Sequence, residues 1–276
     1  MPTARRTPTT APMMTTSTCE TTSLTRIEVR RPASGGRCEV LLACSGSADR
    51  PLVRPMLLSS DEDGARVSLV PEGALLLAGD AVRIEVVVGP GAHLELVEPA
   101  GTVAYAMDGG CARWDVDVVV EAAAGLVWAG EPFVVAEGAR VARRTRVRLG
   151  WEARLALREV LVLGRHGERP GVVEQDLVLL GAGDVPVLVE SLQVGPDSSP
   201  LLLGARVMGT VTVVGERLPA TTEGTRLDLE GRGTMVRHLA DAAHLAVPHE
   251  AWAQARQLVR AICSSTRNCR PSALAR

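Results

Sequence analysis

Residues 88–98 of this 276-residue chain read VGPGAHLELVE, and similar segments follow at 120–131 (VEAAAGLVWAGE), 149–159 (LGWEARLALRE) and, more loosely, 180–190 (LGAGDVPVLVE). Each copy has the pattern of a strand, a corner of about four residues and a second strand. One such unit is too small to bury an apolar face alone, so a repeat of about 30 residues predicts units stacked into an elongated, β-solenoid-like scaffold. The alternative is an ordinary β-sandwich whose hairpins share turn chemistry.

Hydrophobic periodicity indicates that the fold is mainly β. Residues 83–88, 93–96 and 113–118 alternate polar and apolar side chains, and turns rich in Gly, Pro or Ala bound each run. Helical spacing appears only near the C-terminus, in two apolar stripes with Pro248 placed to open the second helix. The stripes are Met235, Val236, Leu239, Ala243 and Ala246, then Trp252, Ala255, Val259 and Ile262. We therefore expect a small C-terminal α-helical segment.

These patterns divide the chain into four regions. Residues 1–24 are rich in Thr and contain no apolar core of a signal peptide, which predicts a disordered tail, with Met13 or Met14 as alternative starts. Residues 25–232 form the repeat-like β scaffold. Residues 233–263 are expected to form a helical hairpin, and residues 264–276 a flexible tail.

Composition excludes several classes of function. All 30 basic residues are Arg, so a Walker A loop and an imine-forming Lys are both excluded. Aromatic residues make up 2% of the chain and the net charge is −2, which argues against nucleic acid and anionic membranes as partners. Six Cys without a CxxC pair favour reduced thiols and a cytoplasmic location. No catalytic motif such as G-x-S-x-G or H-E-x-x-H is present, so we predict no catalytic residues.

Arg144, Arg146 and Arg148 alternate along one predicted strand and share one of its faces. A basic face of this kind is suited to an acidic protein surface or, less well, to nucleic acid. The alternative is a solvated face neutralised by nearby carboxylates, with Glu152, Glu159 and Glu168 as the expected partners.

A carboxylate ends the second strand of every copy: Glu98, Glu131, Glu159 and Glu190. Stacking would bring these positions about 4.8 Å apart, where unpaired carboxylates repel one another. If they point inward, they form a path that holds a divalent cation loosely. If they point outward, they pair with Arg and have no special role; one extra residue before Glu131 also breaks the register.

Ordered motifs from about residue 30 to 246 resemble the UreD (UreH) family of urease accessory proteins. The resemblance lies in LLLAGDAVRI (75–84) followed by VGPGA (88–92), PAGTVAY (99–105), EPF (131–133), GA (138–139), RRT (143–145) and EVLVLGR (159–165) with Glu168. The family's leading Gly-Gly is Glu72-Gly73 here, and Val103 replaces a residue that is often basic.

The resemblance implies a scaffold that is not an enzyme. It would act with a UreF-type helical accessory protein and a UreG-type GTPase to insert nickel into apo-urease, with nickel in transit and no tightly bound cofactor. Motif matching marks Asp80, Thr102, Glu131, Glu159 and Glu168 as candidates for the nickel path. Trp252 on the C-terminal helices, with Arg144 and Arg146, would be candidates for partner docking; plain packing on the β core is the alternative for the helices.

Two other functions remain open at this point. One is a protein-interaction scaffold without a metal role. The other is a β-solenoid enzyme that depends on carboxylates, which would need convergent His residues or a close acid pair in a pocket.

Overall fold

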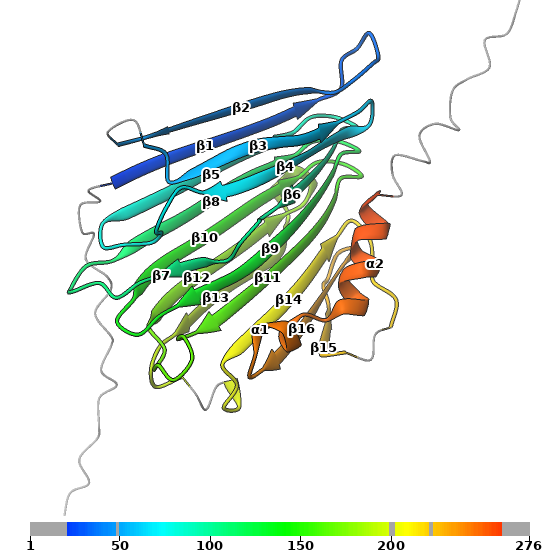
Figure 1. Ribbon diagram of the computed structural model, residues 1–276. Coiled ribbons are helices and arrows are strands. Elements are labelled where there is room, and N and C mark those ends of the chain that lie inside the picture. Colours follow the sequence, from blue (N-terminus) through cyan, green and yellow to red (C-terminus); the bar gives the residue numbers. More distant parts are fainter. Residues whose placement is uncertain (1–20, 48–49, 199–201, 221–222, 261–276) are drawn as a thin grey trace, which may run out of the picture.

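Two stacked β-sheets form the body of the protein in the computed structural model, which describes residues 21–47, 50–198, 202–220 and 223–260 (Figure 1). The first, the seven-stranded sheet, has the order β13-β12-β10-β8-β5-β1-β2. Its strands are β1 (Thr21–Arg30), β2 (Glu39–Gly46), β5 (Asp80–Val88), β8 (Ala112–Val120), β10 (Arg140–Leu149), β12 (Val172–Leu180) and β13 (Pro186–Val194).

The second, the nine-stranded sheet, has the order β15-β16-β14-β11-β9-β6-β4-β3, with β7 paired to β9. Its strands are β3 (Val53–Ser60), β4 (Gly64–Pro71), β6 (His93–Val97), β7 (Thr102–Ala104), β9 (Gly125–Val135), β11 (Arg154–Leu163), β14 (Val207–Val214), β15 (Thr225–Asp228) and β16 (Gly233–Ala240). Two helices, α1 (Ala243–Ala246) and α2 (His249–Arg260), follow. In Figure 1, α2 lies against the outer face of this sheet, where it contacts β9, β11 and β14.

Three of the repeat copies stack as the sequence predicts. The chain passes from one sheet to the other between β5 and β6, β8 and β9, and β10 and β11. Neighbouring copies run parallel and in register, because Val88 pairs with Val120 and Val120 with Leu149. The expected mainly β, solenoid-like fold with a small C-terminal helical segment is confirmed, and the parallel pairing sets it apart from a sandwich of antiparallel hairpins.

The fourth copy does not cross between the sheets, which corrects the repeat prediction. β13 turns back and pairs antiparallel with β12 at the edge of the same sheet. A short 3-10 turn, Ala182–Asp184, replaces the four-residue corner, and both Gly183 and Asp184 have positive φ there. Two successive left-handed residues reverse the chain direction, so this segment forms a hairpin and closes the stack.

The first predicted C-terminal helix is also wrong. Residues Gly233–Ala240 form β16, which pairs with β14 on one side and β15 on the other. Apolar residues at this spacing fit a strand buried on both faces as well as they fit a helix. The strand forms because the backbone N–H and C=O groups on one edge of β14 need hydrogen-bond partners, which β16 supplies. The second helix is confirmed: Pro248 accepts the first α2 hydrogen bond from Trp252 N, and Trp252, Ala255 and Val259 are buried.

The ends of the chain differ slightly from the expected boundaries. β1 begins at Thr21, so the β scaffold starts within the segment predicted as a tail. The rest of that segment, residue Ile262 and the predicted C-terminal tail lie outside the described residues. Small Val, Leu and Ala side chains between the sheets make up most of the core. Among the helices of the described ranges, none combines the length and apolarity that a membrane span requires.

Candidate functional site: a polar cavity between the sheets

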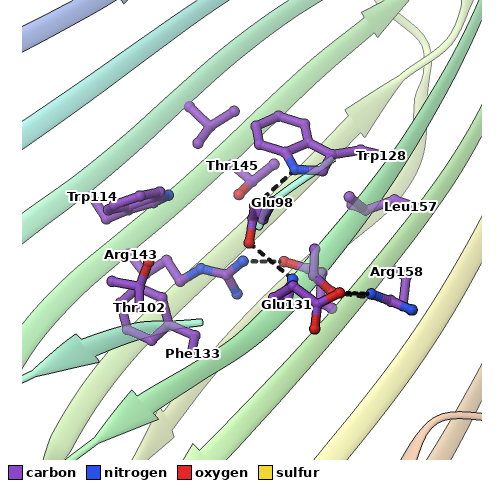
Figure 2. Close-up of a pocket in the computed structure, with 13 residues that line it drawn as sticks. Glu98, Thr102, Trp114, Trp128, Glu131, Phe133, Arg143, Thr145, Leu157 and Arg158 are labelled. Atoms are coloured by element: carbon purple, nitrogen blue, oxygen red, sulfur yellow. Dashed lines mark hydrogen bonds and ion pairs between the residues drawn. The ribbon is translucent and has the colours of Figure 1, made fainter. Parts of the chain in front are cut away.

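A small polar cavity lies between the two sheets, inside an otherwise apolar core (Figure 2). Its free volume is about 30 Å³, enough for one or two water molecules. Its polar lining consists of Glu98, Thr102, Glu131, Arg143, Thr145, Arg158 and Glu159, and its aromatic lining of Trp114, Trp128 and Phe133. Half of the chain's six aromatic residues therefore surround this one cavity.

Glu98 follows β6 and is held by two donors from β9. Trp128 Nε1 donates to one carboxylate oxygen over 2.9 Å, and the backbone N–H of Glu131 donates to the other over 2.8 Å. Burial raises the pKa of Glu98, although both hydrogen bonds favour the ionised form. The carboxylate is thus fixed in position without an Arg ion pair within the described part of the chain.

Arg143 and Glu159 connect the two sheets across the cavity. Arg143 Nη2 on β10 lies 2.7 Å from Glu159 Oε1 on β11, and the two side chains are only 14% and 8% exposed. Arg143 also donates to Gln175 over 2.7 Å, and its guanidinium lies 5.2 Å from the centre of the Phe133 ring. Phe133 in turn makes an edge-to-face contact with Trp114.

Glu131 pairs with Arg158 beside this bridge. The Arg158 Nη2 to Glu131 Oε1 distance is 2.6 Å, and Arg158 Nε donates to the carbonyl of Gly130 over 3.0 Å. The Arg158 guanidinium also lies 5.5 Å from the ring centre of Trp252 on α2. The extra residue of the second repeat copy is absorbed here, because the β9–β11 register shifts between Arg158 and Val160. This bulge lets both Glu131 and Glu159 reach the cavity.

Three of the four repeated carboxylates therefore meet, and they both line the interior and pair with polar donors. Glu98, Glu131 and Glu159 all line the cavity. The sequence predicted either inward carboxylates without Arg partners or outward carboxylates paired with Arg, whereas these carboxylates point inward and are also paired. Glu190 is not part of the group. It lies on β13 of the other sheet and forms a bidentate pair with Arg237 of β16 at 2.8 and 2.9 Å.

The five residues marked for the nickel path fall into two places. Thr102, Glu131 and Glu159 line the cavity. Asp80 is buried at the start of β5, where it accepts the N–H of Leu77 over 2.7 Å, and burial raises its pKa. Glu168 lies in the β11–β12 loop, where it accepts the N–H groups of Arg165 and Glu137. The Arg165 guanidinium lowers the pKa of Glu168 to about 2.

Asp80 and Glu168 each stabilise a turn in this structure. Across residues 21–260, apart from the short gaps, no three His, Cys, Asp or Glu side chains are placed so that together they would hold a metal ion. The carboxylates in the cavity face Arg and N–H donors, and the carboxylates of Asp80 and Glu168 do not line the cavity.

The residues marked for partner docking also differ in position. Arg144 and Arg146 project from the outer face of the seven-stranded sheet, as the alternation predicts. Their face is partly neutralised, but by Asp176, 3.8 Å from Arg144, and Asp184, 3.4 Å from Arg148, rather than by the Glu residues expected. Trp252 is 7% exposed and packs on the nine-stranded sheet, so its indole is not part of the outer surface.

Sequence reasoning missed Arg143, Arg158 and Glu98 as members of one site. The signal for Arg143 was present: it shares strand parity with buried Val141, Thr145 and Val147, whereas Arg144 and Arg146 have the opposite parity. An Arg on the inward face of a strand requires a buried carboxylate partner. The identity of that partner depends on the opposite sheet and is not available from local sequence.

The charged groups of the cavity are paired: three carboxylates face two Arg side chains and two N–H donors. None of the described residues that line the cavity is Ser, Cys or His. A cation that entered would meet carboxylate oxygens whose present partners are Arg guanidinium and N–H groups. Hard oxygen donors bind borderline divalent metals more weakly than imidazole or thiolate does, which permits release.

Comparison with known proteins gives a consistent family assignment. Residues 47–274 match the family described as UreD urease accessory protein. The chain is 43% identical over 219 residues to urease accessory protein UreD 1 of Streptomyces griseus, covering 78% of this chain and 84% of that one. It is 34% identical over 227 residues to UreD of Streptomyces avermitilis (80% and 87%) and 30% identical over 230 residues to UreD of Xanthobacter autotrophicus (82% and 76%). The chain belongs to the UreD family of urease accessory proteins.

Proposed function

We propose that this chain is a scaffold that helps to insert nickel into apo-urease, in a cytoplasmic complex with a UreF-type helical accessory protein and a UreG-type GTPase. The match to the UreD family over residues 47–274 is the observation that carries this proposal. Membership of that family supports a role in urease maturation as an accessory protein that is not itself an enzyme.

The chemistry of the interior supports nickel as cargo rather than as a resident cofactor. Glu98, Glu131 and Glu159 offer oxygen donors from successive strands, with Thr102 beside them. Oxygen ligands exchange more readily than Cys or His ligands, so they are suited to passing a metal on. Asp80, at the start of β5, and Glu168, in the β11–β12 loop, would act outside the cavity.

The missing Lys supports a division of labour within the complex. Nucleotide hydrolysis on a Walker A loop needs a Lys that this chain lacks, so the GTPase partner would supply it. This chain would contribute a frame in which Arg143 pairs with Glu159 and Arg158 pairs with Glu131.

A rescue experiment tests the proposal directly. A host that lacks the gene is complemented with the wild-type chain, with Glu131→Gln/Glu159→Gln, or with the exposed control Glu39→Gln. We expect the deletion and the double variant to yield urease with little nickel, while the control restores it. The readouts are nickel per urease active site, urease activity and co-purification of the accessory proteins. Fully nickel-loaded urease in the deletion strain would overturn the proposal.

A scaffold without a metal role is the second candidate, because Arg or N–H donors already occupy all three cavity carboxylates. The same strains distinguish the two candidates. Unchanged nickel content with intact complexes, both in the double variant and in Asp80→Ala/Glu168→Ala, would favour this second function.

A further inference from the structure

We propose that Trp151 anchors a docking surface for a protein partner that presents an apolar pocket edged by Arg or Lys. The Trp151 surface consists of Trp151 with Glu121, Glu152 and the Arg148–Asp184 pair, at the corners that join the two sheets. The inference rests on the proposed function in one respect: the partner is sought among the three proteins of the maturation complex.

The fold does not need the Trp151 side chain. Three four-residue corners stack at this end of the sheets, at residues 89–92, 121–124 and 150–153. In each corner, the N–H of the fourth residue donates a hydrogen bond of 3.0 to 3.2 Å to the carbonyl of the first residue. The third residue of each corner has positive φ. The second position holds Pro90, Ala122 and Trp151 in turn, so the same backbone forms with Pro or Ala there.

The backbone contacts between corners explain why the side chain is free to vary. Gly91 N donates to the carbonyl of Ala122, and Ala123 N donates to the carbonyl of Trp151. The main chain at the second position therefore carries the stacking, and the indole adds no contact that the corner depends on.

The exposure of Trp151 is unusual within this chain. Its side chain is 77% exposed, whereas Trp114, Trp128, Phe133 and Trp252 are all buried. An Ala would form the same corner, and an indole exposed to water gains none of the free energy that burial of its large apolar surface would provide. Exposed Trp residues are among the commonest anchors of protein interfaces, because one rigid side chain buries a large area in a partner's pocket.

The charges around Trp151 indicate what the partner presents. A hollow of about 350 Å³ beside the indole is lined by Glu121, Arg148 and Asp184. Arg148 and Asp184 pair with each other at 3.4 Å. Within the described ranges, no Arg lies within ion-pair distance of Glu121 or Glu152; Arg30, which pairs with Glu28, interacts with Glu121 at longer range. Because Arg148 and Asp184 neutralise each other, these two carboxylates leave the surface with an excess of negative charge. A cationic side chain would gain from both carboxylates and from the indole face.

The test uses the full-length chain with purified apo-urease, the UreF-type protein and the UreG-type GTPase of the same organism, each titrated separately and as a mixture. Trp151→Ala is compared with Pro90→Ala, which changes the same position of the first corner. We expect Trp151→Ala to weaken binding of one partner by about 10- to 100-fold, and Pro90→Ala to leave it within about twofold. The unfolding temperature of Trp151→Ala should match the wild type, because Ala122 already occupies this position in the middle corner. Pro90→Ala should lower it slightly, because the unfolded chain gains freedom when a Pro is lost.

The charge component has its own readout. Glu121→Gln/Glu152→Gln should flatten the salt dependence of binding to that partner, because it removes the two unpaired carboxylates. Wild-type affinity for all partners in Trp151→Ala would overturn this inference and leave the proposed function standing. A wild-type chain that bound none of the three proteins would overturn the proposed function together with the inference.

Discussion

Arg143 of the seven-stranded sheet and Glu159 of the nine-stranded sheet form an ion pair of 2.7 Å across the interior of the protein. Both side chains are largely shielded from water, and the pair lies beside a core made mostly of Val, Leu and Ala. The cost of removing two charges from water offsets much of the attraction within a buried pair of this kind, whereas breaking the pair leaves one buried charge uncompensated. The free energy of unfolding should therefore change differently when one partner is removed and when both are removed.

Removal of Arg143 alone should be costly. Arg143→Met leaves Glu159 buried and without its ion pair, and we expect a loss of about 3–5 kcal/mol in the free energy of unfolding. Arg143→Met/Glu159→Leu should recover most of this loss, because no unpaired charge remains. Urea denaturation of the three proteins measures both effects. A single variant as stable as the wild type would show that Glu159 reaches water or another donor.

The attachment of α2 should depend on Glu95. This buried carboxylate on β6 accepts from Arg256 over 2.9 Å and also from Arg260, both on α2. Glu95→Ala should raise the amide hydrogen exchange of residues 251–259 by about tenfold or more, while the β9 and β11 amides keep their protection. Gln257→Ala, on the exposed side of the helix, is the control. Unchanged exchange in α2 would mean that apolar packing alone holds it.

Stability should fall in acid because of His93. Burial, together with the nearby Arg260, lowers the pKa of His93 to about 4. The unfolded chain takes up a proton near pH 6.5 and the folded chain does so only near pH 4, so stability is full above pH 6.5 and is lost between these values. The loss should reach about 3 kcal/mol.

Replacing His93 should remove that pH dependence. His93→Asn is expected to flatten the stability profile between pH 6.5 and 4, whereas His166→Asn, at an exposed position, should leave it unchanged. Chemical denaturation at several pH values gives the comparison. A wild-type profile that is flat over this range would contradict the assignment.

Close packing between β14 and α1 requires Gly209. A Cβ at this position would lie 1.9 Å from the carbonyl oxygen of Ala246, and backbone cannot move aside as a side chain can. Gly209→Ala should lower stability by about 2–3 kcal/mol. Gly231→Ala, where a Cβ meets nothing within 4 Å and φ is not positive, should be tolerated. Calorimetric melting of both variants tests this, and equal melting temperatures would show that α1 readily shifts.

Local sequence predicted the parts of the fold that depend on strand periodicity. Alternation placed Arg144 and Arg146 outward, and the repeated corners set the pairing of Val88 with Val120 and of Val120 with Leu149. The same logic failed for residues 233–240, where apolar spacing fits either a helix or a doubly buried strand, and at β13, where a left-handed pair of residues turned a crossing into a hairpin.

From the amino-acid sequence alone, a mainly β fold with repeated units could be predicted, lysine-dependent chemistry could be excluded, and Glu98, Glu131 and Glu159 could be placed at the ends of their units. The three-dimensional fold was needed to show that these carboxylates share one cavity and that Arg143 and Arg158 pair with two of them. It was also needed to show that Trp252 is buried while Trp151 is exposed. This difference comes from the range of the interactions. Alternation and turn chemistry act between neighbouring residues, whereas a partner across two sheets is fixed only after the strands have paired in register and the layers have closed.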